Sequence, residues 1–208
     1  MSRAIELTEQ VIRLVGDRAE AEVVALHGNL ALTRFANSFI HQNVAEDADT
    51  VSLRVAMDGR VASARTTTTT PEALAYFVEA ALETAALQPI DDDWPGLAPP
   101  AAVPPVEHVD DATFDADPAA RAGVVKAFID AGNGMMAAGY CQTEGRAEAF
   151  ANSAGQAAAG RRSSAFIDGI HQTASSAGGA HAASVAIGDL DGTAVGELAA
   201  RRAIDSAA

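Results

Sequence analysis

Histidine and carboxylate side chains can together build a zinc site, and this chain of 208 residues contains five histidines. A local site needs two imidazoles on one helical face with a glutamate between them, so it requires His-Glu followed by a second His one turn later. None of the five is followed by glutamate: they are His27, His41, His108, His171 and His181. The sequence therefore predicts no local zinc motif.

Metal binding would otherwise need distant residues to converge, for example His171 and His181 facing each other on neighbouring strands. A pair of surface strand histidines is the simpler interpretation. The acidic run Asp91 to Asp93 lacks the alternating ligand spacing of a calcium loop, so we expect it to be solvated. We accordingly expect no metal ligand and no bound cofactor in this chain.

Motifs for nucleophilic catalysis or phosphate binding are absent from the sequence. It has no Gly-x-Ser-x-Gly elbow, no Walker loop and no dinucleotide-binding glycine pattern. The single cysteine, Cys141, falls in a predicted strand without an adjacent basic residue, which favours a buried inert thiol over a nucleophile. These patterns predict no catalytic residue.

Two short strings occur twice in the chain. FANS stands at 35–38 and again at 150–153, and IHQ stands at 40–42 and again at 170–172. Asn37 and Asn152 suit a turn, or a side chain that bonds its own backbone, although an amide that binds a ligand at both positions is an alternative. Neither copy brings together groups capable of chemistry, so the strings indicate a repeated architecture.

The charge of the chain bears on its partners and its compartment. The formal net charge is −14 with a pI near 4.6, so we expect no direct binding to nucleic acid or to an anionic membrane. A single cysteine excludes an intrachain disulfide and fits a reducing compartment. No apolar run approaches the length of a membrane span, and the N-terminal residues lack the apolar core of a signal peptide. We expect a cytoplasmic protein.

The first part of the chain predicts a mixture of helices and antiparallel strands. Residues 3–17 have helical apolar spacing. Residues 21–40 suggest a hairpin that turns at Gly28–Asn29, and residues 50–66 suggest a second hairpin around Asp58–Gly59. Pro71, after a run of threonines, then opens another helix. The predicted order is helix, four strands, helix.

A proline-rich strap, residues 89–116, joins two similar halves, 1–88 and 117–208. Proline lacks an amide donor, so we expect the strap to be a connector on the surface, pinned by Trp94, Leu97 and Val103. After it, residues 118–132 predict a helix, followed by strands with a turn at Thr143–Gly145 and a closing helical pattern over 196–207.

The two halves match under a fixed shift. Phe35 and Phe150 lie 115 positions apart, and the same shift moves the helix at 3–17 onto 118–132. We interpret this as an internal duplication, with chance or a simply alternating sheet as the competitors. The fold class is then α/β of the α+β type: largely antiparallel strands in meanders, helices packed on the sheet, and two similar helix-strands-helix halves.

One long string is informative as a whole: RFANSFIHQNVAEDADTVSLRVAMDGRVASARTTTTTPEALAYFVEAALETA, residues 34–84. Its arginine-containing strand, its N-S and H-Q pairs, LRV, DGR and the threonine-capped helix resemble the N-terminal domain of the TldD/PmbA family. ANSAGQ at 151–156, SSAFIDG at 163–169 and GELAARRAIDSA at 196–207 resemble the later part of that domain. Members of this family were once called modulators of DNA gyrase and are regarded as metallopeptidases.

The resemblance implies an α/β N-terminal domain, which a mostly β C-terminal domain follows in complete members. In the peptidase branch the second domain carries His-Glu-x-x-x-His with a further ligand and binds zinc; the PmbA-like branch lacks the motif and partners the active subunit. We expect residues 1–208 to be the N-terminal domain without that metal-binding domain. Zinc is then expected only in the C-terminal domain of an active member.

Our leading hypothesis is a non-catalytic N-terminal domain of a TldD/PmbA-type metallopeptidase or its partner subunit. It would help to enclose a peptide substrate and to form a homo- or heterodimer with a family member. The alternatives are a stand-alone module that binds peptides by strand addition, or an acidic protein that modulates gyrase. Within the resembling string, Arg34, His41, Gln42 and Arg60 are the candidate interaction residues. Whether the chain is itself an enzyme stays open at this point.

Overall fold

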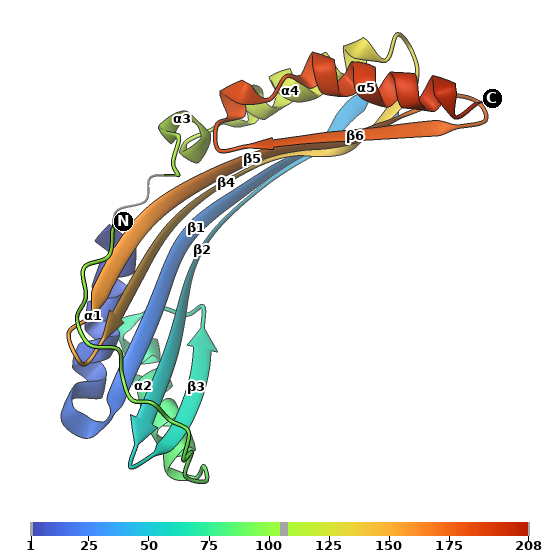
Figure 1. Cartoon of the computed structure of the whole chain (residues 1–208). Helices are drawn as coiled ribbons and strands as arrows, with labels where there is room; N and C mark the ends of the chain where they lie inside the picture. The colour runs from blue at the N-terminus through green and yellow to red at the C-terminus, as the bar shows by residue number, and fades with distance from the viewer. Residues whose placement is uncertain (1, 105–107, 208) are drawn as a thin grey trace. The chain divides into compact units, whose positions relative to one another are not determined.

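A computed structural model of the chain describes residues 2–104 and 108–207 (Figure 1). It contains two successive runs of helix, three strands and helix. The first run consists of α1 (Ser2–Val15), β1 (Glu20–Ala36), β2 (Phe39–Met57), β3 (Arg60–Thr66) and α2 (Pro71–Ala86). The second consists of α4 (Pro118–Ala131), β4 (Met136–Asn152), β5 (Ala157–Gln172), β6 (Ala177–Ser184) and α5 (Gly192–Asp205). The one-turn helix α3 (Asp111–Phe114) lies between the runs.

The six strands form one antiparallel sheet in the order β3-β2-β1-β4-β5-β6. Read outward from the central pair of β1 and β4, each run places its strands in the order of the sequence. This arrangement confirms the α+β fold, with strands in meanders and helices packed on the sheet. It also confirms that the order of helix, strands and helix occurs twice.

The turns predicted at Gly28–Asn29 and at Thr143–Gly145 were wrong. β1 and β4 each continue for 17 residues, through Gly28–Asn29 and through Thr143–Gly145, so each run has three strands and not four. The chain reverses at the FANS strings instead. Asn37 and Ser38 have φ of 52° and 62°, the left-handed values required at both central positions of a tight two-residue hairpin turn. In the second copy, Asn152 Oδ1 accepts a hydrogen bond from the Gln156 amide at 2.9 Å and closes the reversal.

Long-range contacts explain why the chain stays extended at Asn29. Its Nδ2 donates to the Phe114 carbonyl at 3.0 Å, and its Oδ1 accepts from the Gly145 amide at 2.8 Å. A Cβ at Gly145 would lie 2.7 Å from the Phe114 ring, so glycine is needed there for close approach. Both turn-like residues therefore serve tertiary contacts inside the strands.

The Asp58–Gly59 turn was predicted correctly. Both residues have positive φ, 49° and 74°, and the register places Met57 opposite Arg60 directly across the turn. The helix that follows β3 is also confirmed, with Pro71 in its first turn and Thr70 as its N-cap, where Thr70 Oγ1 accepts from the Ala73 amide at 3.3 Å.

The chain forms two compact units, and each draws on both halves of the sequence. Unit 1 comprises Met1–Gly28, Ala48–Glu107 and Ala147–Arg161; unit 2 comprises Asn29–Asp47, His108–Arg146 and Arg162–Ala208. The β1–β2 turn from the first half therefore belongs to unit 2, and the β4–β5 turn from the second half belongs to unit 1. The division into halves at 1–88 and 117–208 stays a prediction.

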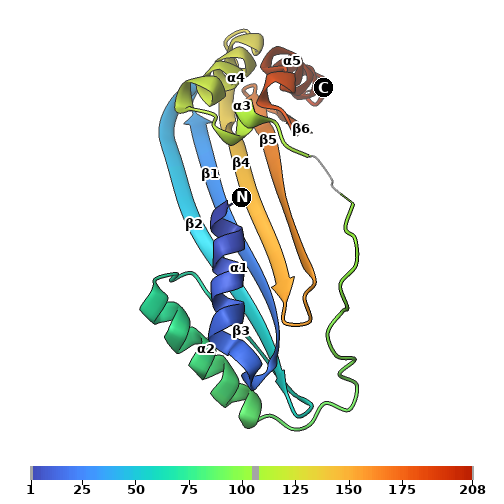
Figure 2. The same cartoon turned by 90° about the vertical axis from the view of Figure 1, so that its left-hand side faces the viewer.

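In unit 1, helices α1 and α2 lie side by side on one face of the strands (Figure 2). The core is mainly aliphatic. α1 contributes a stripe of buried residues at helical spacing, which pack against alternate residues of β1 and β2 and against α2: Ala4, Leu7, Val11 and Val15 with Val23, Val51, Leu53, Val55, Leu74 and Val78.

In unit 2, helices α4 and α5 pack against each other, and α5 packs on β6. Close approach depends on Gly196, because a Cβ there would lie 2.5 Å from the Phe128 carbonyl oxygen. The core centres on Phe128, whose ring lies 5.5 Å from that of Phe35. The predicted helix over 118–132 is confirmed, with Asp117 as its N-cap.

Two residues predicted from the sequence have contrasting outcomes in unit 2. Cys141 is buried as expected, and burial raises the pKa of its thiol to about 11. His171, expected on the surface, is fully buried instead. Its ring stacks on Phe128 at 4.7 Å, and Nε2 donates to the Phe128 carbonyl at 3.0 Å, whereas His181 is exposed. His171 lies opposite Gly178 on β6, so the two histidines do not face each other.

Candidate functional site

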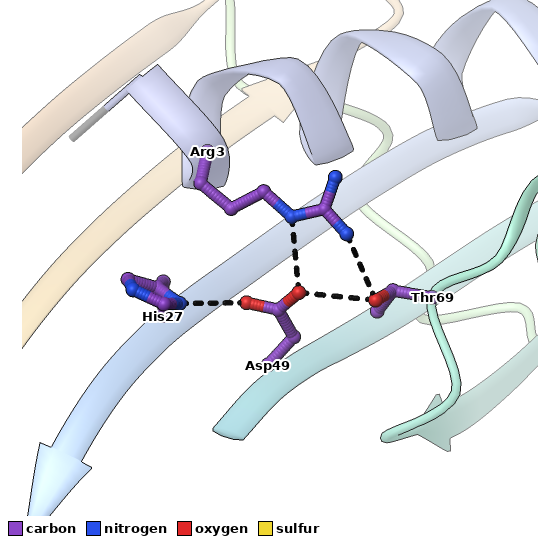
Figure 3. A network of polar contacts seen from close by, with 4 residues as sticks. All are labelled: Arg3, His27, Asp49 and Thr69. Carbon is purple, nitrogen blue, oxygen red and sulfur yellow. Dashed lines mark hydrogen bonds and ion pairs between the residues drawn. The ribbon is translucent and has the colours of Figure 1, made fainter. Parts of the chain in front are cut away.

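A network of four polar side chains joins separate elements of unit 1 (Figure 3). Asp49 of β2 is its centre. Asp49 Oδ1 accepts from His27 Nδ1 of β1 at 2.9 Å, and Oδ2 accepts from Arg3 Nε of α1 at 3.0 Å. Thr69, in the connection between β3 and α2, donates its hydroxyl to Asp49 Oδ2 at 3.0 Å and accepts from Arg3 Nη2 at 3.0 Å.

The environment of Asp49 keeps its carboxylate ionised. Burial alone raises the pKa of this carboxyl, but the hydrogen bonds from His27, Arg3 and Thr69, together with the charge of Arg3, lower it below the ordinary value of 3.8. Because an ionised carboxylate only accepts hydrogen bonds, the His27 proton in this bond is on Nδ1.

The network contains a histidine and a carboxylate, as a catalytic triad does, but they are not arranged as in a triad. In a triad the histidine accepts a proton from the nucleophile and the carboxylate only orients the ring. Here the hydroxyl of Thr69 donates to the carboxylate itself and is held by Arg3. The arrangement is therefore a clamp that fixes the start of α1 and the Thr69 segment to two strands.

The face of unit 1 opposite α1 and α2 carries the side chains that alternate with the core residues. Arg54 lies across from Ser63, and Ser52 across from Arg65. We call this surface the outer face, defined by Glu22, Val24, Ser52, Arg54, Ser63 and Arg65. Arg54 Nη2 forms an ion pair with Glu22 Oε2 at 2.7 Å, so part of the charge on this face is neutralised locally.

Two adjoining cavities lie on the outer face. The first has a volume of about 420 Å³ and is lined by the outer-face residues and Phe150. The second has a volume of about 480 Å³ and lies between the strap, at Val103 and Pro104, and the β4–β5 hairpin. Val24 and Phe150 line both cavities, so the two form one groove with apolar residues in its middle.

The strap is anchored beside this groove by Trp94, as predicted. Its Nε1 donates to Glu20 Oε2 at 2.8 Å, and the Arg54 guanidinium lies 5.6 Å from the centre of its ring. Asn152 also holds the strap, because its Nδ2 donates to the Ala98 carbonyl at 2.8 Å. Val103, expected to be an anchor, is 54% exposed and lines the groove instead.

The four candidate interaction residues fall into two places. Arg34 and Gln42 meet across the β1–β2 hairpin in unit 2, where Arg34 Nη1 donates to Gln42 Oε1 at 3.3 Å. His41, on the same hairpin, has its ring 6.4 Å from that of Phe39. Arg60, in unit 1, donates to the Gln88 carbonyl and pairs with Ile90, so it holds the start of the strap. Their role in binding a partner stays a prediction.

The groups that the structure does bring together had no local signal in the sequence. Arg3, Asp49 and Thr69 are separated by 20 to 66 positions. Within residues 2–104 and 108–207, no group of three or more His, Cys, Asp or Glu side chains is arranged to hold a metal ion. Over the same residues, no helix is long and apolar enough to cross a membrane.

Comparisons with known proteins agree with this fold. Residues 21–85 match the family model described as PmbA/TldA metallopeptidase domain 1. TldE from Thermococcus kodakarensis has a TM-score of 0.78 at 17% identity, over 97% of this chain and 47% of that chain. A candidate modulator of a DNA gyrase from Thermotoga maritima has a TM-score of 0.75 at 16% identity, over 96% of this chain and 47% of that chain. A candidate modulator of DNA gyrase from Bacteroides thetaiotaomicron has a TM-score of 0.85 at 14% identity, over 98% of this chain and 50% of that chain. No curated protein sequence matches the chain.

The chain is thus similar to the first domain of the PmbA/TldA metallopeptidases in residues 21–85 of its sequence, and to the solved structures in its fold. The match over residues 21–85 agrees with the resemblance predicted from the sequence. The solved structures show the same fold for nearly the whole chain, and the chain spans about half of their length.

Proposed function

We propose that this chain acts as the non-catalytic N-terminal domain of a TldD/PmbA-type metallopeptidase or of its partner subunit, and that it helps to enclose a peptide substrate. The family match over residues 21–85 and the shared fold support the first part. The groove on the outer face of unit 1 supports the second part and is the observation on which the proposal rests.

The groove suits an extended chain of ordinary composition. Val24 and Val103 are 45% and 54% exposed and offer apolar contact, which favours burial of a ligand side chain. The small residues 157–160 leave room beside them. The ion pair between Glu22 and Arg54 reduces any preference for a charged ligand. These properties favour sequence-tolerant binding of an uncharged peptide segment.

Fluorescence anisotropy with a labelled, unstructured and uncharged peptide tests the proposal. Val24→Asp places a charge in the middle of the groove, and we expect it to weaken binding roughly tenfold or more, because a buried charge without a partner is costly. Tyr76→Asp is the matched control, since Tyr76 is 77% exposed on α2 and lines neither cavity. Absence of binding by the unaltered chain, or equal losses in both variants, contradicts the groove as the site.

We further propose that the chain associates with a second family member, on the grounds of the family resemblance. Light scattering of the chain alone and mixed with a complete TldD-type subunit tests this. A monomer under both conditions contradicts association. Stoichiometric zinc in the purified chain, with peptide cleavage that a chelator abolishes, contradicts the non-catalytic role.

The edge of the sheet supports a second candidate, a stand-alone module that binds peptides by strand addition. β3 is an edge strand, and in the described part of the chain, pairing on its outer side is confined to the bridge between Arg60 and Ile90. A peptide with alternate backbone N-methyl groups distinguishes the two candidates. Strand addition predicts loss of binding, because the ladder donors are gone, whereas side-chain contacts in the groove predict retained binding.

A further inference from the structure

Arg121 of α4 is the largest fully buried side chain of the described chain, with 1% of its surface exposed. Its guanidinium contacts three neutral oxygens in unit 2. Nε donates to Thr33 Oγ1 at 3.3 Å, and Nη1 donates to Thr143 Oγ1 at 3.0 Å and to the Ala116 carbonyl at 3.0 Å. The side chain thus connects α4 to β1 and β4.

None of the ion pairs within the described chain includes Arg121, although the charge of Asp117, at the start of α4, acts on its guanidinium. An arginine stays protonated at neutral pH, and buried charges in proteins are normally paired with an opposite charge. The hydrogen bonds from Nε and Nη1 all go to neutral acceptors. An anionic group from outside the chain would complete the site.

A cavity of about 360 Å³ provides access to Arg121. Its walls come from residues 29–31 of β1, 45–47 of β2 and 114–116, with Pro118 and Thr143 beside Arg121. Glu46 and Asp115 are exposed members of this lining. The cavity therefore has a buried cation on its inner side and carboxylates at its solvent side. A simple anion would be repelled by that rim, whereas a molecule with charges of both signs matches it.

We propose that this cavity binds a small zwitterion: a free basic amino acid, or the basic C-terminal residue of a peptide. The ligand carboxylate accepts a hydrogen bond from the Arg121 guanidinium, and the cationic group of the ligand lies towards Glu46 and Asp115. The pairing brings a carboxylate into direct contact with the Arg121 guanidinium and neutralises the rim. This site is in unit 2 and does not depend on the proposed peptide groove of unit 1.

Isothermal titration calorimetry of the chain with L-arginine tests the proposal directly. We expect saturable binding of one molecule, and binding of argininamide, which lacks the carboxylate, weaker by roughly tenfold or more. Acetate, which lacks the cationic group, should also bind more weakly. The dipeptide Gly-Arg separates the two sources: tighter binding than free arginine assigns the site to a peptide end, and weaker binding assigns it to the free amino acid.

Two variants locate the binding. Glu46→Gln combined with Asp115→Asn changes only exposed carboxyls. It should weaken the binding of L-arginine without lowering the midpoint of thermal unfolding. Glu83→Gln on α2 is the control and should leave the binding of L-arginine unchanged. Arg121→Gln should abolish the preference for arginine over argininamide. If that variant does not fold, the affinities of the unaltered chain for arginine and for argininamide still test the role of the ligand carboxylate. No saturable heat with arginine or Gly-Arg at millimolar concentration, or equal affinity for arginine and argininamide, overturns the proposal.

Discussion

Replacement of Asp49 by asparagine is the sharpest test of the polar network in unit 1. The change preserves the size of the side chain but removes its charge. It also places an NH₂ group where the carboxylate accepted hydrogen bonds from His27, or from Arg3 and Thr69. At least one hydrogen bond to the charged carboxylate is then lost, and one donor faces another donor.

The contacts of Asp49 set the size of the expected effect. A hydrogen bond to a charged group contributes about 1.5–3 kcal/mol. Asp49 itself is only 15% exposed, but Arg3 and His27 are 43% and 37% exposed, so solvent screens part of the interaction. We expect Asp49→Asn to lower the free energy of unfolding by about 2 kcal/mol at neutral pH.

The effect should depend on pH in a defined direction. The folded pKa of Asp49 is lower than its ordinary value of 3.8, so the unfolded chain takes up the proton first as the pH falls. The contribution of the carboxylate is therefore complete above pH 3.8 and is lost as the pH falls through the folded pKa. Asparagine has no such contribution to lose, so the difference between the two proteins should close in acid.

Urea denaturation followed by tryptophan fluorescence measures this effect, because the single tryptophan, Trp94, lies in unit 1. Asp92→Asn, an exposed acidic residue of the strap, is the matched control and should change little. A difference below about 0.5 kcal/mol at neutral pH, the range of ordinary surface substitutions, refutes the clamp. A difference that persists unchanged in acid refutes the role of the ionised carboxylate.

Three further predictions concern the core of unit 2. Gly132→Ala puts a Cβ 2.2 Å from the His171 ring, so it should lower the free energy of unfolding, measured by chemical denaturation, by about 1–3 kcal/mol. Gly123→Ala meets no atom within 4 Å and should instead stabilise the protein by about 0.5–1 kcal/mol, because alanine favours the helix. Equal effects of the two substitutions contradict the packing. Burial lowers the pKa of His171, so stability should be complete above pH 6.5 and decline as the pH falls below it, and thermal melts of His171→Gln should lack that component. Cys141, with its pKa raised to about 11, should react with a thiol reagent only as fast as unit 2 opens, and rapid labelling of the folded chain contradicts its burial.

Local sequence signals predicted the helices and the Asp58–Gly59 turn well. The apolar spacing of α1, the capped start of α2 and the Asp58–Gly59 turn depend on nearby residues, and the structure has all three. The doubled FANS string also indicated a repeated architecture. The turn that Asn37 suits is confirmed, although the hairpin over residues 21–40 had been predicted to reverse at Gly28–Asn29.

The turn predicted at Gly28–Asn29 failed because residues far along the chain determine that backbone. The side chain of Asn29 is bonded to Phe114 and Gly145, 85 and 116 positions away, and these bonds hold β1 extended. Turn propensity is a local preference, which such tertiary contacts override.

The candidate sites were beyond sequence reasoning for the same reason. Asp49 is one of several acidic residues in a polar stretch, and only the fold brings Arg3 and Thr69 to it. Arg121 stands on a helix where an arginine is ordinarily exposed, and its burial follows from the packing of α4 on β1 and β4. The outer-face groove combines three parts of the chain that no local pattern connects.

The central claim, that an extended peptide lies in the outer-face groove, is tested most directly by photo-crosslinking. An unstructured peptide with a photoreactive side chain would be irradiated with the chain, and the modified residues would be identified by mass spectrometry. The account predicts crosslinks at Val24, Val103 and Phe150, suppressed by unlabelled peptide. Crosslinks concentrated on α2 around Tyr76, or none that unlabelled peptide suppresses, would contradict it.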